Sequence, residues 1–489
     1  MTRLSAQSAQ QGSAAWPGYR PEDHAPGIVH LGLGNFARAH LLAYTDHALA
    51  LHGGDWRVTG ASLRGTAVAE SLVPQDGRYT LITRGAEVSA RVIGALAGVF
   101  AGPDVIRQTL AAMIAPACRI VSLTVTEKGY GITSAGELDR SHPAVRADLV
   151  TPAAPVGVIG LIVAALVMRR NAGLGALSVL SCDNLSHNGQ KLRSAVLEFA
   201  TETHGTDLAT WIEAEARFPA TMVDRITPAS TPATAETAAR LTGYQDLAAV
   251  ETEPFSQWVI EDDFCAGRPA WEQAGALFVR NVAPYEQMKL RMLNGAHSML
   301  AYSGQLAGRT YVREVMADPT HALLVRAHLA AAAATVRGLN MDLEAYASAL
   351  ADRFSNPAIA HSTAQIAMDG TQKLPQRITA PALEALAAGT PVRPFAFALA
   401  AWLAWIARRD TEGRLCPLDD PKSAALIAVI ERQTTASGLV SAIANVCPDI
   451  LPPNLSGGPF GAALRELLTM ILAEGMPAAI AREAQALGR

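Results

Sequence analysis

The chain has 489 residues; half of them are hydrophobic, 17% are charged, and the formal net charge is −4 at pH 7. This composition excludes a disordered chain, favours two large globular domains, and gives no reason to expect nucleic acid or an anionic membrane as a partner. Five scattered cysteines without close pairing, and a polar N-terminus without an apolar leader, indicate a protein of the reducing cytoplasm.

Apolar strands and helices alternate through the first half of the chain. We predict strands at 27–34, 56–63, 119–125 and 176–180, with helices at 36–51, 105–116 and 156–170. This alternation is typical of an α/β domain with a parallel sheet covered on both faces. The apolar run 156–168 is shorter than the roughly 20 residues that span a bilayer, so we interpret it as a helix buried against the sheet.

The second half of the chain is mainly helical. Helical patterns appear at 285–306, 319–338, 341–354, 380–388, 395–408, 423–435 and 459–487, and no strong strand accompanies them. The change of pattern indicates a domain boundary near 280–285. We therefore predict one domain over 1–283 and a second, mainly α-helical domain over 284–489.

The first predicted strand ends in Gly32-Leu-Gly34, directly before a helix. Glycines at such a turn let the backbone approach a pyrophosphate, which the helix N-terminus attracts. The pattern is incomplete, because Ala37 stands where a third glycine is usual, and an ordinary tight turn would look the same. The second strand lacks the acidic residue that commonly binds the ribose of NAD, whereas Ser62 and Arg64 could accept the extra phosphate of NADP. The choice between NAD and NADP stays open.

Only five of the 40 basic residues are lysines, and Lys289 stands in a helical pattern with two other polar residues, Asn294 and His297. Unlike Arg, Lys can lose its proton when desolvated and can then act as a base. At about 100° per residue the three side chains share one side of a helix, where they could transfer a proton to or from an alcohol or carbonyl. A solvated helix face with one core histidine is the simpler alternative. No metal site is expected, because His297 has no His or Cys at the spacing of a ligand pair.

The run from Lys289 through Asn294 to His297 resembles the catalytic motif of the mannitol dehydrogenase family, the polyol-specific long-chain dehydrogenases. Further segments between 27 and 410 are similar to the same family. They are Gly32-Leu-Gly34-Asn35-Phe36-Ala-Arg38-Ala-His40, Ser181-Cys-Asp183-Asn184, Phe218-Pro-Ala-Thr-Met-Val223-Asp224-Arg225-Ile226-Thr-Pro228 and Glu253-Pro-Phe-Ser-Gln257-Trp258-Val-Ile-Glu261-Asp262.

The resemblance implies a Rossmann-like N-terminal domain and a largely helical C-terminal domain, with the active site between them. It implies metal-independent hydride transfer between NAD, with NADP not excluded, and a secondary alcohol of an open-chain sugar derivative. Cofactor contacts are expected at Gly32, Gly34, Asn35 and Phe36, with Arg64 as a further candidate from the second strand.

By the same resemblance, Lys289 is the general acid/base, and Asn294 and His297 polarise the carbonyl and bind hydroxyl groups. Asn184 and Asp224 are expected beside the substrate and the base. A carboxylate near Lys289 would orient its ammonium group, although the negative charge alone would raise the lysine pKa, so desolvation has to lower it.

The substrate is indicated by residues in two segments. Mannitol-type members have Thr-Glu-Gly-Gly-Tyr after the third strand, whereas this chain has Lys128 at the third position of that run, and they have Arg where this chain has Gln365. The segment from Gln365 to Arg377 resembles the fructuronate reductase branch of the family. A uronate has a carboxylate that a ketose lacks, and Lys128, Lys373 and Arg377 could bind it.

Several alternatives remain open at this stage. The leading hypothesis is interconversion of D-fructuronate and D-mannonate; the rivals are a mannitol 2-dehydrogenase and enzymes acting on arabinitol or tagaturonate. A non-catalytic sugar- or nucleotide-binding protein and a membrane-bound dehydrogenase subunit are less economical hypotheses. The expected partner is a small sugar acid or polyol, and a monomer or a small homo-oligomer is acceptable.

Overall fold

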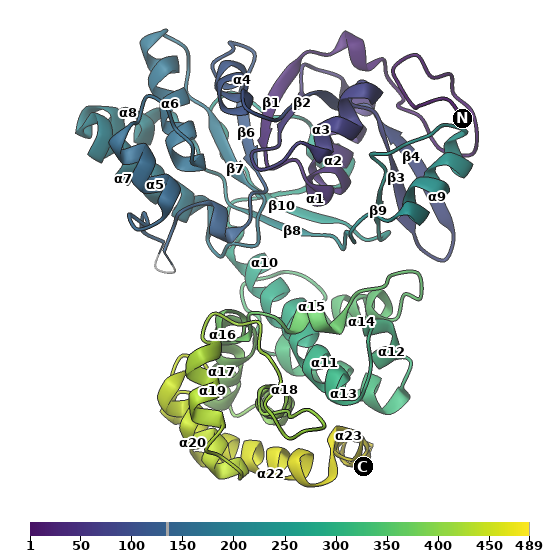
Figure 1. Ribbon diagram of the computed structural model, residues 1–489, viewed down its shortest axis with the longest axis vertical. Helices are drawn as coiled ribbons and strands as arrows, with labels where there is room; N and C mark the ends of the chain where they lie inside the picture. Colours follow the sequence, from purple (N-terminus) through teal and green to yellow (C-terminus); the bar gives the residue numbers. More distant parts are fainter. Residues whose placement is uncertain (134–135, 489) are drawn as a thin grey trace. The chain divides into compact units, whose positions relative to one another are not determined.

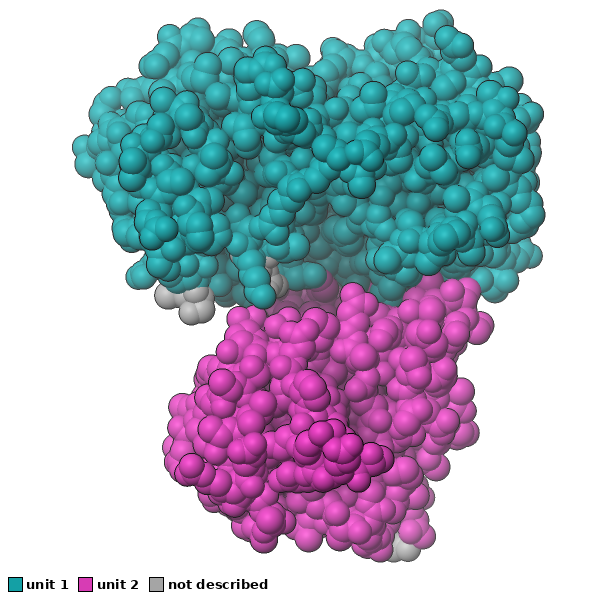
Figure 2. Space-filling view, in the orientation of Figure 1, with its two compact units in different colours: residues 1–283 teal, residues 284–489 magenta. Residues whose placement is uncertain are grey.

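The computed structural model describes residues 1–133 and 136–488 and forms two compact units, Met1–Ala283 and Pro284–Arg489. Figure 1 traces the chain through both, and Figure 2 colours the two units separately. The first unit is an α/β domain, and the second is mostly helical.

The first unit contains a five-stranded sheet in the order β5-β2-β1-β6-β7, with every neighbouring pair parallel. The strands are β1 (Pro26–Leu31), β2 (Arg57–Ala61), β5 (Leu96–Phe100), β6 (Ile120–Leu123) and β7 (Ser178–Ser181). The predicted strands at 27–34, 56–63, 119–125 and 176–180 correspond to four of them. This order is that of a Rossmann domain: β1 is in the middle, β2 and β5 are added on one side of it, and β6 and β7 on the other.

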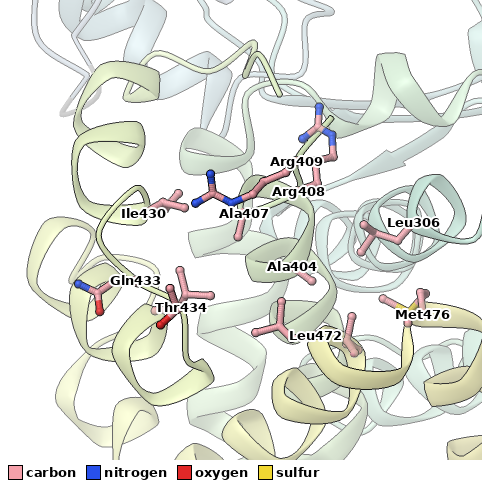
Figure 3. A pocket seen from close by; sticks show the side chains of 13 residues that line it. Leu306, Ala404, Ala407, Arg408, Arg409, Ile430, Gln433, Thr434, Leu472 and Met476 are labelled. Carbon is pink, nitrogen blue, oxygen red and sulfur yellow. The ribbon is translucent and has the colours of Figure 1, made fainter. Parts of the chain in front are cut away.

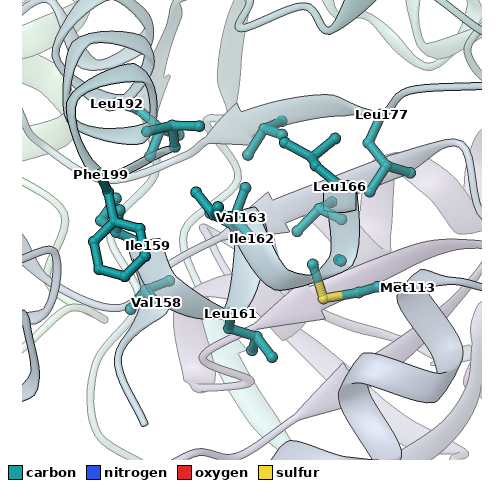
Figure 4. Close-up of a cluster of buried hydrophobic side chains, with 14 of the residues drawn as sticks. Met113, Val158, Ile159, Leu161, Ile162, Val163, Leu166, Leu177, Leu192 and Phe199 are labelled. Carbon is teal, nitrogen blue, oxygen red and sulfur yellow. The ribbon is translucent and has the colours of Figure 1, made fainter. Parts of the chain in front are cut away.

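Both faces of this sheet are buried, as the strand alternation predicted. Val29 and Leu31 of β1 point into one apolar cluster, with side chains of α4, α6 and α7, and Figure 4 shows part of that cluster. Ile28 of the same strand points into a second cluster, with Val58 of β2 and residues of α1 and α2. The alternation follows from the pleat, since successive side chains of a strand leave opposite faces.

Helices of the first unit cover these faces, except that α9 packs on the strand β3 of a smaller sheet. They are α1 (Asn35–Ala39), α2 (Leu41–His52), α3 (Ala67–Leu72), α4 (Val105–Met113), α5 (Pro143–Val150), α6 (Val158–Asn171), α7 (Asn188–His204), α8 (Thr206–Glu215) and α9 (Pro232–Thr242). The apolar run 156–168 forms most of α6, which is buried in the core, so that prediction is confirmed. Within the described residues, no helix is both long and apolar enough to cross a membrane.

Two small sheets in the first unit were not predicted. One has the order β4-β3-β9, with β3 (Tyr79–Arg84), β4 (Val88–Ile93) and β9 (Val250–Thr252); the other has the order β11-β10-β8, with β8 (Thr221–Asp224), β10 (Gln257–Glu261) and β11 (Leu277–Val279). Leu81 pairs with Val250, a partner far along the chain. β8, β9 and β11 have only three or four residues each, which leaves little local periodicity to read, whereas β3 and β4 form a local antiparallel hairpin that the sequence interpretation missed.

The second unit is built around α18 (Arg393–Ile406), in which every residue from Phe395 to Ile406 is buried. A helix that is apolar all round belongs in the interior of a helical domain. Its other helices are α10 (Ala283–Met288), α11 (Gly295–Leu306), α12 (Val312–Met316), α13 (Pro319–Ala333), α14 (Leu343–Phe354), α15 (Thr363–Ala367), α16 (Gly370–Leu374), α17 (Ala380–Ala388), α19 (Ser423–Ile430), α20 (Ala436–Val446), α21 (Pro453–Ser456), α22 (Gly458–Glu474) and α23 (Met476–Leu487).

Three predicted helices are not continuous. The helix at 36–51 breaks at His40, between α1 and α2. The helix at 459–487 breaks at Gly475, whose φ of +86° is a left-handed conformation open to glycine. The helix at 285–306 contains a π-helical segment, Lys289–Asn294, between α10 and α11, and a second π-helix, Pro375–Thr379, joins α16 to α17.

Candidate active site

The turn after β1 requires glycine at its first position. Gly32 has a φ of +92°, and a Cβ atom built there would lie 2.3 Å from the carbonyl oxygen of Thr124. Thr124 follows β6, the strand beside β1, so the turn lies where the strand order reverses. Ligands of parallel α/β sheets bind at this carboxyl-end crevice.

Among the residues that the structure describes, no contact requires glycine at the second position of the turn. Gly34 has an ordinary φ of −100° and is exposed, and the nearest atom to a Cβ built there is 3.9 Å away. A glycine retained in open space suits a ligand that approaches the backbone closely. Ala37 is fully buried, so a small residue there lets α1 pack close to the sheet.

Asn35 holds this turn to a neighbouring segment. Its Oδ1 accepts a hydrogen bond from Arg38 Nη2 at 2.6 Å, and its Nδ2 donates to the Pro228 carbonyl and to Ser230 Oγ, each at 3.2 Å. Phe36 stacks on His40 with ring centroids 5.0 Å apart. The two predicted cofactor residues therefore have structural contacts of their own.

Arg64 is exposed in the loop that follows β2. Its Nη2 atom lies 3.7 Å from the position of a Cβ at Gly129, in the loop after β6. Ser62 donates a hydrogen bond to the Gly65 carbonyl at 2.7 Å, which shapes the turn around Arg64. A cation is thus available at the carboxyl end of the sheet, near the cofactor turn.

Asp183 connects the ends of β6 and β7. It accepts hydrogen bonds from the backbone N–H groups of Val125 at 2.8 Å and Thr126 at 3.1 Å, and from the Tyr130 hydroxyl at 2.8 Å. Thr126 has a φ of +67°, a strained conformation for a β-branched residue. Such strain is common at functional sites, where surrounding contacts hold it.

Lys128 and Asn184 are exposed in the two loops that Asp183 connects. Asp224, the last residue of β8, is buried with 4% of its surface exposed. Burial raises the pKa of the Tyr44 hydroxyl, and the nearby negative charge of Asp224 raises it further. Lys128 and Asn184 thus add an exposed cation and an exposed amide to Arg64 at this end of the sheet, whereas Asp224 is buried.

Lys289 and Asn294 are the first and last residues of the first π-helix, and Lys289 is buried with 8% of its surface exposed. In a regular α-helix these two residues would lie about 140° apart around the axis. The Gly295 N–H instead donates to the Leu290 carbonyl, a π-helical bond that spans five residues. Because Asn294 lies five residues after Lys289, it is about one π-helical turn further on and faces the same side.

His297 lies three residues into the following α-helical register, about 60° from Asn294. The three side chains therefore occupy a narrower arc than a continuous α-helix would give. Burial lowers the pKa of His297 well below its usual value, and the nearby His361, Arg353, Arg377 and Lys289 lower it further. His297 is accordingly neutral near pH 7.

The second π-helix packs directly against the first. A Cβ atom at Gly295 would lie 2.9 Å from the carbonyl oxygen of Arg377, so only glycine allows this approach without a shift. Arg377 Nη1 donates to Ser298 Oγ at 3.2 Å. The packing brings the Arg377 guanidinium into the surroundings of His297.

Lys373 has structural contacts in this unit. Its ammonium group donates to the carbonyl oxygen of Met368 at 2.6 Å and is 3.5 Å from that of Ile366, at the end of α15. Part of its hydrogen-bonding capacity therefore stabilises the α15–α16 junction. Arg377 is the residue of this pair whose charge acts on His297.

A cavity of about 480 Å³ lies elsewhere in the second unit, beside the C-terminal end of α18 (Figure 3). Its lining includes Leu306, Arg408, Gln433, Leu472 and Met476, and none of the predicted site residues. The predicted catalytic residues lie elsewhere, Lys289 and Asn294 on the first π-helix and His297 in α11.

Two residues near His297 were missed by the sequence interpretation. Arg353 is in α14, and His361 lies in the loop between α14 and α15. His361 lies with its ring 5.0 Å from that of His297, nearly perpendicular to it. No local pattern marks either residue, because the loop reaches His297 only when α14 packs in the folded domain.

Comparison with known proteins gives one consistent result. A family model described as the mannitol dehydrogenase Rossmann domain matches residues 26–273, and one described as the mannitol dehydrogenase C-terminal domain matches residues 281–447. The chain is 42% identical to the uncharacterized oxidoreductase YdfI of Escherichia coli K12, covering 96% of this chain and 97% of that protein.

Two further relatives have described activities. The D-mannonate oxidoreductase of Escherichia coli K12 is 42% identical over 87% of this chain and 90% of its own length. The structure of Pseudomonas fluorescens mannitol 2-dehydrogenase in a ternary complex with NAD and D-mannitol is 34% identical, with a TM-score of 0.86 over 99% of this chain and 100% of that chain.

Proposed function

This chain belongs to the mannitol dehydrogenase family of oxidoreductases, and we propose that it transfers hydride between NAD and a secondary alcohol of an open-chain sugar acid. The proposed pair is D-mannonate and D-fructuronate. The family includes enzymes that act on polyols and enzymes that act on sugar acids. The proposal therefore depends on residues that would distinguish a substrate with a terminal carboxylate from one with a terminal hydroxymethyl group.

The positive charge around His297 is the observation on which the sugar-acid proposal rests. Lys289, Arg353 and Arg377 all act on this one imidazole by charge repulsion. A neutral polyol gains little from such a cluster, whereas a carboxylate gains charge-assisted hydrogen bonds, especially from the planar guanidinium of Arg. The 42% identity to a D-mannonate oxidoreductase supports the same choice.

Proton transfer is assigned to Lys289. In the oxidation direction the neutral amine takes the proton from the substrate hydroxyl; in reduction the ammonium returns a proton to the new oxygen. Asn294 donates from its amide, and the neutral His297 donates from its ring N–H, so both can stabilise negative charge that develops on the oxygen. Burial of Lys289 and His297 excludes water and strengthens these interactions.

The residues of the first turn fit a dinucleotide. Gly32 makes the turn possible, and Gly34 leaves open, exposed backbone where a pyrophosphate can approach. Bound NAD would supply the hydride acceptor. In the same proposal Arg64, which is exposed in the loop after β2, interacts with the adenosine end of the cofactor, and NADP is the alternative cofactor.

Further contacts in the proposal come from residues at the sheet edge. Lys128 and Asn184 are exposed at that edge and are available to bind substrate hydroxyl or carboxylate oxygens. Asp224 is proposed to orient the base. Lys373 contributes less to substrate binding in this proposal, because its ammonium group already donates hydrogen bonds to backbone carbonyls.

A mannitol 2-dehydrogenase is the second candidate function. It is favoured by the high structural similarity to the Pseudomonas fluorescens enzyme with NAD and D-mannitol. The two candidates differ at one end of the substrate only. The open-chain backbone and the reacting secondary alcohol are the same kind of group in both.

Steady-state kinetics with D-fructuronate and D-fructose, each with NADH and with NADPH, test the proposal; D-tagaturonate and D-xylulose extend the comparison. We expect kcat/KM for fructuronate to exceed that for fructose at least about 10-fold. In Arg377→Met the fructuronate value should fall about 10- to 100-fold and the fructose value less than about threefold. Arg337→Met, an exposed arginine in the same unit, is the control. Equal or better turnover of fructose by the unmodified enzyme would overturn the sugar-acid assignment.

A further inference from the structure

His361 lies beside His297, although His297 is in α11 and His361 is in the loop between α14 and α15. The two rings meet edge to face, with centroids 5.0 Å apart and an interplanar angle of 84°. The Phe354 ring is another neighbour of His297, with ring centroids 4.5 Å apart. His297 therefore contacts one apolar ring and a second imidazole, in addition to the nearby cations.

Neither imidazole has a hydrogen bond to the part of the chain that the structure describes. His297 Nε2 and His361 Nδ1 are both buried and without a partner. The other buried histidines of this unit each have one hydrogen-bonded nitrogen and one without a partner: His321 Nε2 bonds Ser303 Oγ at 2.7 Å, and His328 Nδ1 lies 3.4 Å from the Pro394 carbonyl. Buried polar atoms in native proteins are normally paired, so two adjacent rings without partners point to a ligand that pairs them.

The chemistry of the surrounding groups indicates what that ligand needs. Lys289, Arg353 and Arg377, the cations that act on His297, are donors and have no acceptor atom when protonated. Each hydroxyl group of a sugar must also donate a hydrogen bond. Burial lowers the pKa of His361 to about 4, so at neutral pH its ring has one N–H and one acceptor nitrogen.

We propose that His361 contacts the substrate. His297 and His361 bind neighbouring hydroxyl groups of the open-chain sugar, and a ring nitrogen of His361 accepts a hydrogen bond at a place where the surrounding cations can only donate. This rests on the proposed function, because it presumes that a sugar derivative occupies the surroundings of His297. His361 is thus a specificity residue for polyhydroxylated substrates, acting on binding and not on proton transfer.

The variants His361→Phe and His361→Asn test this proposal, with His321→Asn as the control for loss of a buried histidine in the same unit. Each is compared by KM and kcat for the sugar, KM for the nicotinamide cofactor, and the midpoint of thermal unfolding. In His361→Phe we expect KM for the sugar to rise at least about 10-fold and kcat to change less than about threefold. His361→Asn, whose amide has a donor and an acceptor, should recover part of the loss. The cofactor KM should stay within about twofold in both.

Three results would overturn the proposal. The first is a sugar KM within twofold of the unmodified enzyme in a folded His361→Phe. The second is an equal rise in His321→Asn. The third is a rise that appears only together with a lower unfolding midpoint. If His361→Phe does not fold, His361→Asn decides by the same criteria against His321→Asn. If the enzyme prefers a polyol to the sugar acid, the proposed sugar-acid substrate is wrong. The His361 variants are then measured with that polyol, so failure of the proposed substrate and failure of the His361 proposal are distinguishable.

Discussion

Arg291 binds Glu384 through two parallel hydrogen bonds, from Nη1 to Oε2 at 2.6 Å and from Nη2 to Oε1 at 2.5 Å. Arg291 belongs to the first π-helix, and Glu384 belongs to α17, which directly follows the second π-helix. Arg291 Nη1 also donates to the Thr335 carbonyl at 2.6 Å. The pair therefore ties together the two segments that hold Lys289 and Arg377.

Replacing Glu384 with Ala should destabilise the second unit and impair catalysis together. The Arg291 side chain is only 6% exposed, so loss of its carboxylate leaves a largely buried cation unpaired. Because Glu384 itself is 49% exposed, we expect a moderate loss of about 1–3 kcal/mol of unfolding free energy. We also expect a lower kcat. Denaturant unfolding measures the change in stability, and steady-state kinetics measure the change in kcat.

Glu474→Ala is the matched control, since Glu474 forms an ion pair with Arg482 in which both side chains are well exposed. Such a pair contributes about 0–1 kcal/mol. If the two variants lose the same stability and activity, the Arg291–Glu384 pair has no special part in holding the π-helices.

Replacing Lys289 with Met should remove turnover by about 10²–10⁴-fold or more, because the base is lost while the side chain keeps a similar volume. Binding of NADH, followed by its fluorescence, should be largely unchanged, since the cofactor turn belongs to the first unit. Lys422→Met is the control: this exposed lysine pairs with Asp449. Turnover near that of the unmodified enzyme would exclude Lys289 as the base.

Substitutions at Gly32 and Gly34, the two glycines of the turn after β1, should have different effects. Gly32→Ala combines an unfavourable positive φ with a contact of 2.3 Å to a backbone carbonyl, so we expect a loss of about 1–3 kcal/mol of stability. Gly34→Ala has neither problem, so its free energy of unfolding should lie within about 0.5 kcal/mol of that of the unmodified protein. If a pyrophosphate approaches this backbone, Gly34→Ala should nonetheless weaken NADH binding at least about 10-fold. Unchanged binding in Gly34→Ala would contradict the proposed cofactor contact.

The buried His321 should make the second unit sensitive to acid. Burial lowers the pKa of His321 from its usual 6.5 to about 4, so between these values the unfolded chain binds a proton that the folded chain does not. Stability therefore falls as the pH decreases through this window. From pH 7.5 to 5.0 this one group accounts for about 2 kcal/mol.

Denaturant unfolding of His321→Asn at the two pH values measures this contribution. The variant should be less stable than the unmodified protein at pH 7.5, because it loses the bond to Ser303. When the pH is lowered from 7.5 to 5.0, the variant should lose about 2 kcal/mol less unfolding free energy than the unmodified protein loses. Equal losses in both proteins would show that His321 does not titrate as its burial predicts.

The sequence predicted much of the fold because the relevant patterns are local. Alternating apolar strands and helices indicated β1, β2, β6 and β7, and the loss of strands after residue 284 separated the helical part. The short strands of β8 and β9 were missed, since their pairing partners lie far along the chain. The π-helix at Lys289 was also missed, because a single extra residue per turn leaves the apolar pattern almost unchanged.

By itself, the sequence determined the parallel sheet with its Gly32 turn, and the group formed by Lys289, Asn294 and His297. These depend on neighbouring residues, whose spacing sets which face or turn they share. Only the tertiary structure decided that His361 lies against His297 and that Arg291 binds Glu384, 93 residues away. The physical reason is that such contacts form when helices pack through their apolar faces and carry the loops between them into place. No periodicity within one segment specifies which polar side chains this packing brings together.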